Sequence, residues 1–491
     1  MILNEDTIRL ILGLKIRTLR SEKGISLTEL ALKTGVSVSY LNEIEKSKKH
    51  PKPSKIALIA DALDVSYDQL VSLEMDKKQL TVARLLSSEF MKELPLEHFG
   101  LDNSTLIDAF TTAPARFGAF INTLIEIARS HDISVDQFYF DALRSFQEMH
   151  ENYFGEIEAS AQQLAELYSL EQNDVNLTPK LELILKEKFG ITVSYQLQKQ
   201  TGLAQLRSLY HSKKQQLLIN GLLSTNQKAF ILAKEIGFQF QELHDRPNTS
   251  AWAKSESFEA VLNNFKASYF AGALLISCDQ LVEDMQQVFS STTWDSEKLA
   301  TIINSYPATS EVFMYRLTSI LPKFFGLHQL FFLKFDHDIQ SGETVLAKEL
   351  HLAGLHNPHA SFLNEHYCRR WISISLLENK MTKGSNEMKI GIQRSSYVNS
   401  SNEYLVISIA RPEHPNKEKS NSLTIGLLIN PVLAQKVQFL NDEKIISRLV
   451  NITCERCELT DCAERAAAPI KFIKKQAQER LINAIENFLN E

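Results

Sequence analysis

The sequence predicts a multidomain protein with an all-α N-terminal part, a central α+β domain and a C-terminal α/β domain. The chain has 491 residues, which is too many for one hydrophobic core, so three or four domains are expected. Residues 5–73 carry the apolar spacing of several short helices, and residues 76–155 look helical throughout with few breakers. Three apolar runs bounded by loops, 326–336, 403–412 and 422–430, are typical of strands, and residues 471–489 are typical of a closing helix.

The composition is that of an ordinary globular protein and excludes several classes. With 44% hydrophobic and 23% charged residues and a net charge of -6, the chain is not a general polyanion binder, so any affinity for nucleic acid needs a local basic patch. The acidic start MILNEDTIRL is unlike a secretory signal, and no apolar run reaches membrane-spanning length. We therefore expect a cytosolic protein without membrane association, whose five cysteines are not structural disulfides.

The first helices are marked by their capping residues. Residues 5–23 form an amphipathic pattern that ends at Gly24, and Ser26 with Glu29 three residues later is a capping box. Gly35 stands where the chain must turn sharply, a place where a residue without Cβ costs least. The pattern predicts a helix, a tight turn and a second helix.

The second of these helices has a small polar outer face. Ser37 can cap it, and Leu41 and Ile44 point inward at i, i+3 spacing. Short hydrogen-bonding side chains on an exposed helix suit the edges of bases in a DNA major groove. The candidate base-facing residues are Ser37, Val38, Ser39, Tyr40, Asn42 and Glu43. The candidate phosphate-facing residues, from the lysine-rich loop that follows, are Lys46, Lys48 and Lys49.

This stretch resembles the phage-repressor (XRE-type) helix-turn-helix family over residues 1–75. The shared marks are Arg20, Leu30-Ala31, Gly35, Tyr40-Leu41 and Ile44-Glu45. The resemblance implies a DNA-binding domain in which Arg20 pairs with Glu45. One departure is Leu27, where the family has a glutamine that helps hold a phosphate. The alternative is a helical hairpin for protein contact, which the adjacent lysine run disfavours.

Residues 76–151 are expected to be a helical connector that supports a homodimer, because repressors of this type read two half-sites through a two-fold axis. The next region, 152–285, resembles the ImmA/IrrE-like metallopeptidases, through NYFGEIE at 152–158 and AFILAKEIGF at 229–238.

Peptidases of that family carry HExxH on this helix, with two histidines on zinc and a glutamate that activates water. Here Glu235 is present, but Lys234 and Phe238 replace the histidines, and Asn264 stands at the third ligand position. The resemblance implies a degenerate domain with no catalytic residues, so we expect a protein that is not an enzyme. Glu235 is expected to pair with Lys234 or another polar group.

The last region, 286–491, carries a cysteine pattern. Cys454, Cys457 and Cys462 form C-x2-C-x4-C, whose thiolates can converge on a soft metal, and Cys368 is the natural fourth ligand. The strands and final helix suggest an α/β sensor domain of GAF-like character.

The tail resembles the C-terminal sensor domain of the short-chain fatty-acyl regulator family. Its marks are Cys454, Cys457, Asp461, Cys462, Arg465 and Ala466, with an upstream Cys368-Arg-Arg-Trp371 that has arginine where the family has proline. The resemblance implies a [4Fe-4S] cluster on Cys368, Cys454, Cys457 and Cys462, and a coenzyme A thioester as effector. Structural zinc on the same four thiols is the alternative, and Cys368 could instead be a buried small hydrophobe.

Together these observations predict a dimeric, sequence-specific DNA-binding transcriptional regulator that binds a double-stranded operator. It would respond to a short-chain acyl-CoA, to redox state, or to both. Two other functions remain open from the sequence: a zinc-dependent, repressor-cleaving peptidase of ImmA type, and an antitoxin-like adaptor with autoregulatory DNA binding.

Overall fold

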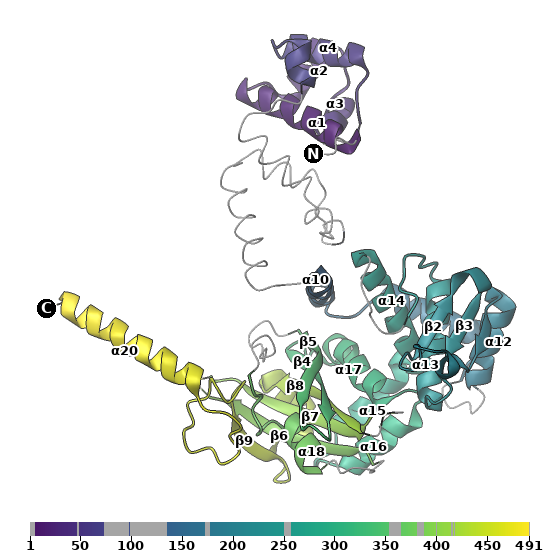
Figure 1. The fold of residues 1–491 in the computed structure, drawn as a ribbon, viewed down its shortest axis with the longest axis vertical. Coiled ribbons are helices and arrows are strands. Elements are labelled where there is room, and N and C mark those ends of the chain that lie inside the picture. Colours follow the sequence, from purple (N-terminus) through teal and green to yellow (C-terminus); the bar gives the residue numbers. More distant parts are fainter. Residues whose placement is uncertain are drawn as a thin grey trace. The chain divides into compact units, whose positions relative to one another are not determined.

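The fold of the chain is shown in Figure 1, a computed structural model. It describes residues 5–46, 49–72, 98, 135–171, 177–249, 257–352, 365–380, 387–398, 400–413, 416 and 418–490. The chain divides into two compact units, an N-terminal unit (Met1–Ala142 with Glu256–Glu259) and a C-terminal unit that holds the rest. Most of the expected connector, 76–151, and Lys48 of the lysine-rich loop lie outside the described residues.

The N-terminal unit contains a five-helix domain. Its helices are α1 (Glu5–Glu22), α2 (Leu27–Thr34), α3 (Val38–Glu45), α4 (Pro53–Ala62) and α5 (Tyr67–Val71). They enclose one small core in which Ile16, Leu30 and Leu41 are fully buried. The helices α2 to α5 have ten residues or fewer and are too short to be stable alone, so packing against this core holds the domain together.

The expected caps of α2 and α3 are confirmed. The Ser26 side chain accepts from the Glu29 N–H, and the Glu29 carboxylate accepts from the Ser26 N–H at 3.0 Å. Gly35 ends α2 in the left-handed region, with φ +64°, where a side chain would be strained. Ser37 accepts from the Tyr40 N–H and so starts α3. These local signals fix the angle between the two helices.

The next elements belong to the C-terminal unit, except that α10 up to Ala142 and the first two residues of α14 are counted with the N-terminal unit. The elements are α10 (Val135–Met149), α11 (Gly155–Leu167), α12 (Leu177–Phe189), β1 (Thr192–Ser194), β2 (Ser208–His211), β3 (Gln216–Ile219), α13 (Thr225–Phe240) and α14 (Phe258–Leu275). The strand order is β1-β3-β2, in which β1 is parallel and β2 antiparallel to β3.

A larger six-stranded sheet follows. Three helices lead into it, α15 (Cys278–Phe289), α16 (Ser296–Ser305) and α17 (Ser310–Phe325). Its strands are β4 (Leu330–Asp338), β5 (Thr344–His351), β6 (Lys389–Tyr397), β7 (Glu403–Pro412), β8 (Lys419–Leu428) and β9 (Ile446–Val450), in the order β5-β4-β8-β7-β6-β9. The remaining helices are α18 (Ile372–Lys380), α19 (Pro431–Lys436) and α20 (Ile470–Asn490).

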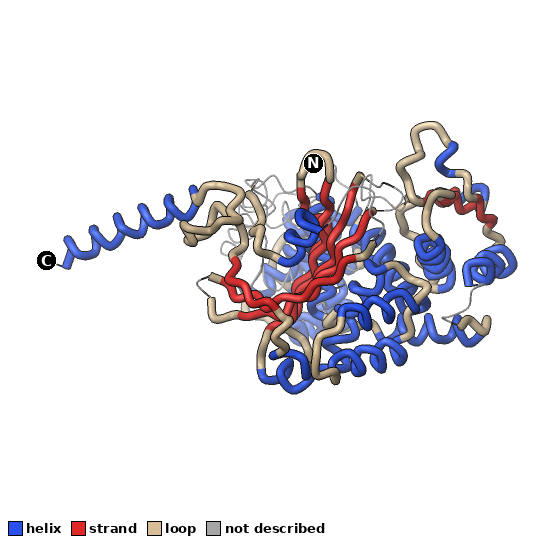
Figure 2. Tube along the Cα trace, turned by 90° about the horizontal axis from the view of Figure 1, so that it is seen from below, coloured by secondary structure: helices blue, strands red, loops and turns tan. Residues whose placement is uncertain are grey.

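Helices lie on both faces of this sheet (Figure 2). Alternate residues of β4 point to opposite faces: the Phe332 ring contacts Tyr315 of α17, whereas Phe335 contacts Tyr367 and Trp371 on the α18 side. On that second face the Phe331 ring lies over Gly426 of β8, where a Cβ would come within 2.1 Å of the ring. A glycine is therefore required at that strand pairing.

The expected strands and the final helix are confirmed as β4, β7, β8 and α20. The α/β class is wrong for this domain, because every neighbouring pair in the large sheet is antiparallel except β6–β9. Hairpins rather than helical crossovers join most strands, so the domain is α+β. In the part of the chain that the structure describes, no helix is long and apolar enough to cross a membrane.

Candidate nucleic-acid interface and thiol site

The outer face of α3 presents the residues that the sequence assigned to base contact. Ser37, Val38 and Ser39 are exposed, and Tyr40, Asn42 and Glu43 are half-buried, whereas Leu41 and Ile44 point into the core. Short hydroxyl and amide side chains on such a face can donate to and accept from base edges. The arrangement suits entry of α3 into a major groove.

One buried ion pair positions α3. Arg20 of α1 donates to both carboxylate oxygens of Glu45, from Nε to Oε1 at 2.6 Å and from Nη2 to Oε2 at 2.9 Å. Its Nη1 also donates to the Ile25 carbonyl at 2.8 Å, which attaches the turn before α2 to the same arginine. The Glu45 side chain is only 3% exposed. A bidentate pair with little water around it fixes orientation as well as distance, so α1 and α3 are held as one body.

The lysine loop folds back onto α3, a contact that the sequence did not indicate. Lys49 forms an ion pair with Glu43, Nζ to Oε2 at 2.9 Å, and its ammonium lies 5.8 Å from the centre of the Tyr40 ring. Glu43 is the only acidic residue of the candidate base-facing set. The pair lowers the negative potential that this carboxylate would present to DNA.

In the C-terminal unit, the three positions aligned with zinc ligands meet where α13 crosses α14. The Lys234 ammonium donates to Asn264 Oδ1 at 2.6 Å and lies 5.8 Å from the Phe238 ring centre. A Cβ on Gly237 would come within 2.9 Å of the Phe270 ring, so this glycine lets the two helices approach closely. Burial, with the nearby Arg246 cation, lowers the pKa of Lys234 to about 7.

Arg246 is the partner of Glu235. Its Nη1 and Nη2 donate to the two carboxylate oxygens at 2.7 Å each, and Gln239 donates to Oε1 at 2.9 Å. The guanidinium also stacks on Phe238, 3.7 Å from the ring centre. Sequence reasoning left the partner open and did not find Arg246, which comes from a loop after α13 with no periodic relation to the helix. Both oxygens of Glu235 are engaged, so this carboxylate is not free to activate water.

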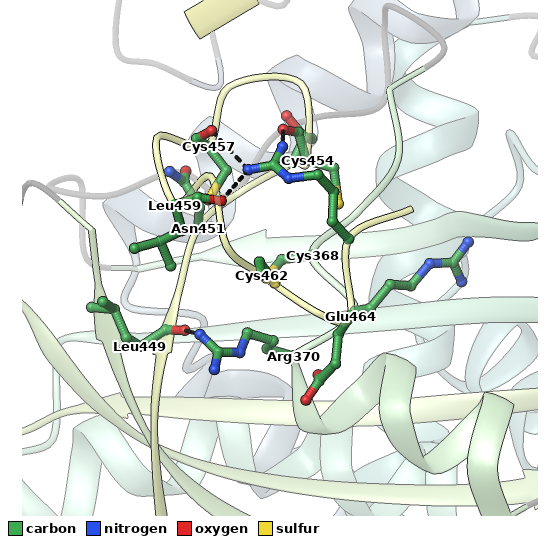
Figure 3. Close-up of a pocket in the computed structure, with 12 residues that line it drawn as sticks. Cys368, Arg370, Leu449, Asn451, Cys454, Cys457, Leu459, Cys462 and Glu464 are labelled. Atoms are coloured by element: carbon green, nitrogen blue, oxygen red, sulfur yellow. Dashed lines mark hydrogen bonds between the residues drawn. The ribbon is translucent and has the colours of Figure 1, made fainter. Parts of the chain in front are cut away.

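The four predicted cysteines line one pocket (Figure 3). Cys368 lies just before α18, and Cys454, Cys457 and Cys462 lie in the loop after β9. Two backbone bonds hold the segments side by side: Cys368 N–H donates to the Ile452 carbonyl at 3.1 Å, and Cys454 N–H donates to the His366 carbonyl at 2.9 Å. Burial raises the pKa of the Cys368 thiol to about 11.

Arg465 organises the cysteine loop. Its Nη1 donates to the Cys454 carbonyl at 2.7 Å, and its Nη2 donates to the carbonyls of Cys457, at 3.1 Å, and Leu459. The Ala466 N–H points at Cys454 Sγ, 3.4 Å away, a backbone contact of the kind that tunes metal-bound sulfur. The sequence marked Arg465 and Ala466 as motif residues, and the structure shows what each of them touches.

The donor set fits a four-thiolate group by chemistry and by location, since four thiols are what an iron–sulfur cluster or structural zinc requires. The four sulfurs are not arranged as a chelate in this structure: among the described residues, no three Cys, His, Asp or Glu side chains are placed to hold a metal ion.

The same loop starts α20. The Glu455 carbonyl, between Cys454 and Cys457, accepts from the N–H groups of Lys471 and Phe472 at 3.0 Å each. The Lys471 ammonium also forms an ion pair with Glu365. The first turn of α20 is thus attached to the cysteine loop.

Comparisons with known proteins match two regions of the chain. Residues 16–70 match the helix-turn-helix family model, and residues 186–318 match the IrrE N-terminal-like domain. The HTH-type transcriptional regulator SinR of Bacillus subtilis (strain 168) is 37% identical over 82 residues, which are 16% of this chain and 71% of SinR. The uncharacterized HTH-type transcriptional regulator YazB of the same strain is 39% identical over 62 residues, which are 13% of this chain and 90% of YazB.

One solved structure, a Mycobacterium tuberculosis transcriptional regulator, aligns with 67% of this chain and 93% of its own, at 16% identity and a TM-score of 0.47. The sequence matches to SinR and YazB, together with the capped α2–α3 pair and its Arg20–Glu45 link, identify the first 70 residues. The chain belongs to the XRE-type family of HTH transcriptional regulators, and it carries an IrrE N-terminal-like domain after its DNA-binding domain.

Proposed function

We propose that this regulator reads an operator as a homodimer through α3 and that its C-terminal unit is a sensor without hydrolytic activity. The observation that carries the DNA-reading part is the exposed polar face of α3, held by the Arg20–Glu45 pair. Ser39 and Asn42 are the short polar residues on that face that are free of the Glu43–Lys49 pair, and we assign them to base edges. Lys46, Lys48 and Lys49 contact phosphates.

The test of this assignment is a gel-shift series against an operator selected from random duplexes. Asn42→Ala is expected to lose about 1–3 kcal/mol of discrimination at one base pair, as for a base-edge contact. Lys46→Ala is expected to weaken binding to all sequences equally. Unchanged selectivity in both Ser39→Ala and Asn42→Ala would show that α3 is not the reading helix.

The residues that fill the α13–α14 crossing support the proposal that the domain has no peptidase activity. A zinc peptidase needs neutral histidines and a free carboxylate around the ion. Here an ammonium occupies one ligand position, a phenyl ring another, and Glu235 is bound by Arg246. We propose that the domain serves as a scaffold between the DNA-binding domain and the sensor. Stoichiometric zinc at this site with Glu235-dependent proteolysis would contradict the proposal.

For the sensor we propose a [4Fe-4S] group on Cys368, Cys454, Cys457 and Cys462, with structural zinc as the alternative group on the same thiols. A cluster of this type would supply redox sensitivity. The protein's part is to hold the two cysteine segments together and to fix the loop through Arg465. The six-stranded sheet with helices on both faces supports a GAF-like sensor, and a short-chain acyl-CoA is the proposed effector.

The deciding experiment is anaerobic purification followed by a visible spectrum, iron and zinc analysis, and operator binding with and without acyl-CoA. A brown protein with iron bound, which loses its colour in Cys457→Ser, is the expected result. Colourless protein with one zinc supports the alternative group. Operator affinity that no acyl-CoA changes would remove the effector from the proposal and leave the metal site standing.

A further inference from the structure

The helix α20 is exposed along its whole length. It leaves the cysteine loop and extends away from the rest of the C-terminal unit (Figures 1 and 2). None of its 21 residues, all of which the structure describes, is buried. Most helices of this length in globular proteins bury one face, because propensity alone does not stabilise them well in water.

The exposed helix is amphipathic. Large apolar side chains recur at helical spacing, and they are strongly exposed, from 45% for Ile482 to 77% for Phe488. The polar residues gather on the other side of the helix, among them Asn483 and Glu486. The apolar stripe consists of Ile470, Ile473, Ala477, Leu481, Ile485 and Phe488. An apolar stripe about 27 Å long from Ile470 to Phe488, interrupted by Lys474, indicates an interface on this exposed helix.

The charges on α20 are divided between its two halves. The half attached to the body is basic and the distal half carries only an acidic residue. The charged residues in chain order are Lys471, Lys474, Lys475, Glu479, Arg480 and Glu486. A second α20 laid parallel would place lysines opposite lysines, whereas an antiparallel one places the basic half opposite the acidic end. Lys475 and Glu486 lie 11 residues apart, about three turns, and so share one flank of the helix, as antiparallel pairing requires.

We propose that α20 is a homodimer interface in which the helices of two copies pair antiparallel through this stripe. The pairing is isologous, with the two-fold axis near Leu481, so that Ile473 of one copy lies against Phe488 of the other. This inference deepens the proposed function, since it rests on the homodimeric reading of DNA and names the surface that makes the dimer. Because α20 begins on the cysteine loop, a change in that loop would move the dimer axis.

One helix pair is a small interface, below the roughly 800 Å² per partner of a standard complex. We therefore expect a dimer that dissociates on dilution. Sedimentation velocity of the full chain over a range of concentrations should show this equilibrium. Leu481→Asp is expected to raise the dimer dissociation constant at least tenfold, since it places two carboxylates at the two-fold axis. Asn483→Asp adds the same charge on the polar face and should leave the constant unchanged.

The antiparallel sense is tested by cysteine cross-linking, with the linked peptides identified by mass spectrometry because the chain has five native cysteines. Leu481→Cys should link to its own copy. Ile473→Cys should not, because the two sites lie about 24 Å apart across the axis, but it should link to Phe488→Cys in a mixture. Self-linking of Ile473→Cys would overturn the antiparallel pairing.

Wild-type and Leu481→Asp proteins with the same oligomeric state at every concentration would overturn the interface itself. Binding to a single half-site separates this failure from failure of the proposed function. A monomeric Leu481→Asp protein that still binds one half-site supports both the reading helix and the interface. If the dimer is lost and half-site binding was never present, the interface stands and the assignment of α3 fails.

Discussion

Two of the bidentate arginine–glutamate pairs, one from each unit, stand in opposite relations to the sites around them. Arg20–Glu45 links α1 to α3 and leaves the polar outer face of α3 exposed, whereas Arg246–Glu235 engages the carboxylate that the resemblance to metallopeptidases would assign to activating water. Both glutamate side chains are 3% exposed. The same interaction therefore supports the proposed recognition surface in one unit and, in the other, engages both oxygens of the Glu235 carboxylate.

The comparison shows why a retained motif residue does not establish a retained activity. Glu45 and Glu235 both stand at their family positions. The surroundings of the two carboxylates differ. Glu45 pairs with the arginine that the family resemblance implies, whereas Glu235 pairs with an arginine in space that zinc-ligating histidines would need to keep open. Function depends on whether the residue's acceptor atoms are already occupied.

The largest effect is expected from breaking the pair in the C-terminal unit. Arg246→Met leaves the Glu235 carboxylate buried with Gln239 as its remaining donor, which should cost about 3–5 kcal/mol in the free energy of unfolding. The measurement is urea unfolding followed by tryptophan fluorescence, because all three tryptophans lie beyond residue 250 and report only the C-terminal unit. The double variant Glu235→Gln/Arg246→Met removes both charges and should recover most of the loss. A single variant as stable as the parent would contradict the buried pair.

Breaking the N-terminal pair should cost a similar or smaller amount of stability, because Arg20 is slightly more exposed than Arg246, at 15% against 11%. It should also abolish operator binding. Arg20→Met is expected to unfold the five-helix domain at lower urea while tryptophan fluorescence stays unchanged, so hydrogen exchange of α1–α3 is the measurement. Lys33→Met, at an exposed position of α2, is the control for stability. Loss of DNA binding without any change in exchange would instead make Arg20 a DNA contact.

The sequence predicted the first pair and not the second for a physical reason. The Arg20–Glu45 pair was implied by the resemblance to XRE-type repressors, whereas Arg246 reaches α13 from a loop and has no periodic relation to it. The convergence of Lys234, Phe238 and Asn264 was implied by family resemblance, and the observed Lys234–Asn264 contact agrees with it. The local apolar run 403–412 predicted both ends of β7, Glu403–Pro412, without error.

Strand direction was not predictable in the same way. The antiparallel pairing of β4 with β8 joins residues about 90 positions apart, and local apolar runs do not encode partners at that distance. The cysteine pocket was easier to predict from the sequence, since three of its four thiols lie close together in the chain. The hydrogen bonds from Arg465 to the loop carbonyls could not be predicted, because the direction of each carbonyl depends on the loop conformation.

A smaller effect concerns the charge of Lys234. Its folded-state pKa is lowered to about 7 by burial, below the value of about 10.4 in an unfolded chain. Between these two values the unfolded state binds more protons, so the stability of the C-terminal unit should rise as pH increases from about 7 toward 10. Lys234→Met should reduce the slope of this part of the profile without removing it, because burial also lowers the pKa of Lys348 to about 8; urea midpoints by tryptophan fluorescence are the measurement. A wild-type profile already flat over that range would mean that Lys234 stays charged.

The smallest effect separates the two roles open to Lys49. In the structure it neutralises Glu43 on α3, whereas the proposed function assigns it to a phosphate. If it can do both, Glu43→Gln frees the ammonium and should raise affinity for any duplex while preserving selectivity. Lys49→Ala should reduce the slope of log affinity against log salt by about 1. If Lys49 serves only Glu43, the double variant Glu43→Gln/Lys49→Ala should bind as the parent does with the same salt slope, and the phosphate contact would then fall to Lys46.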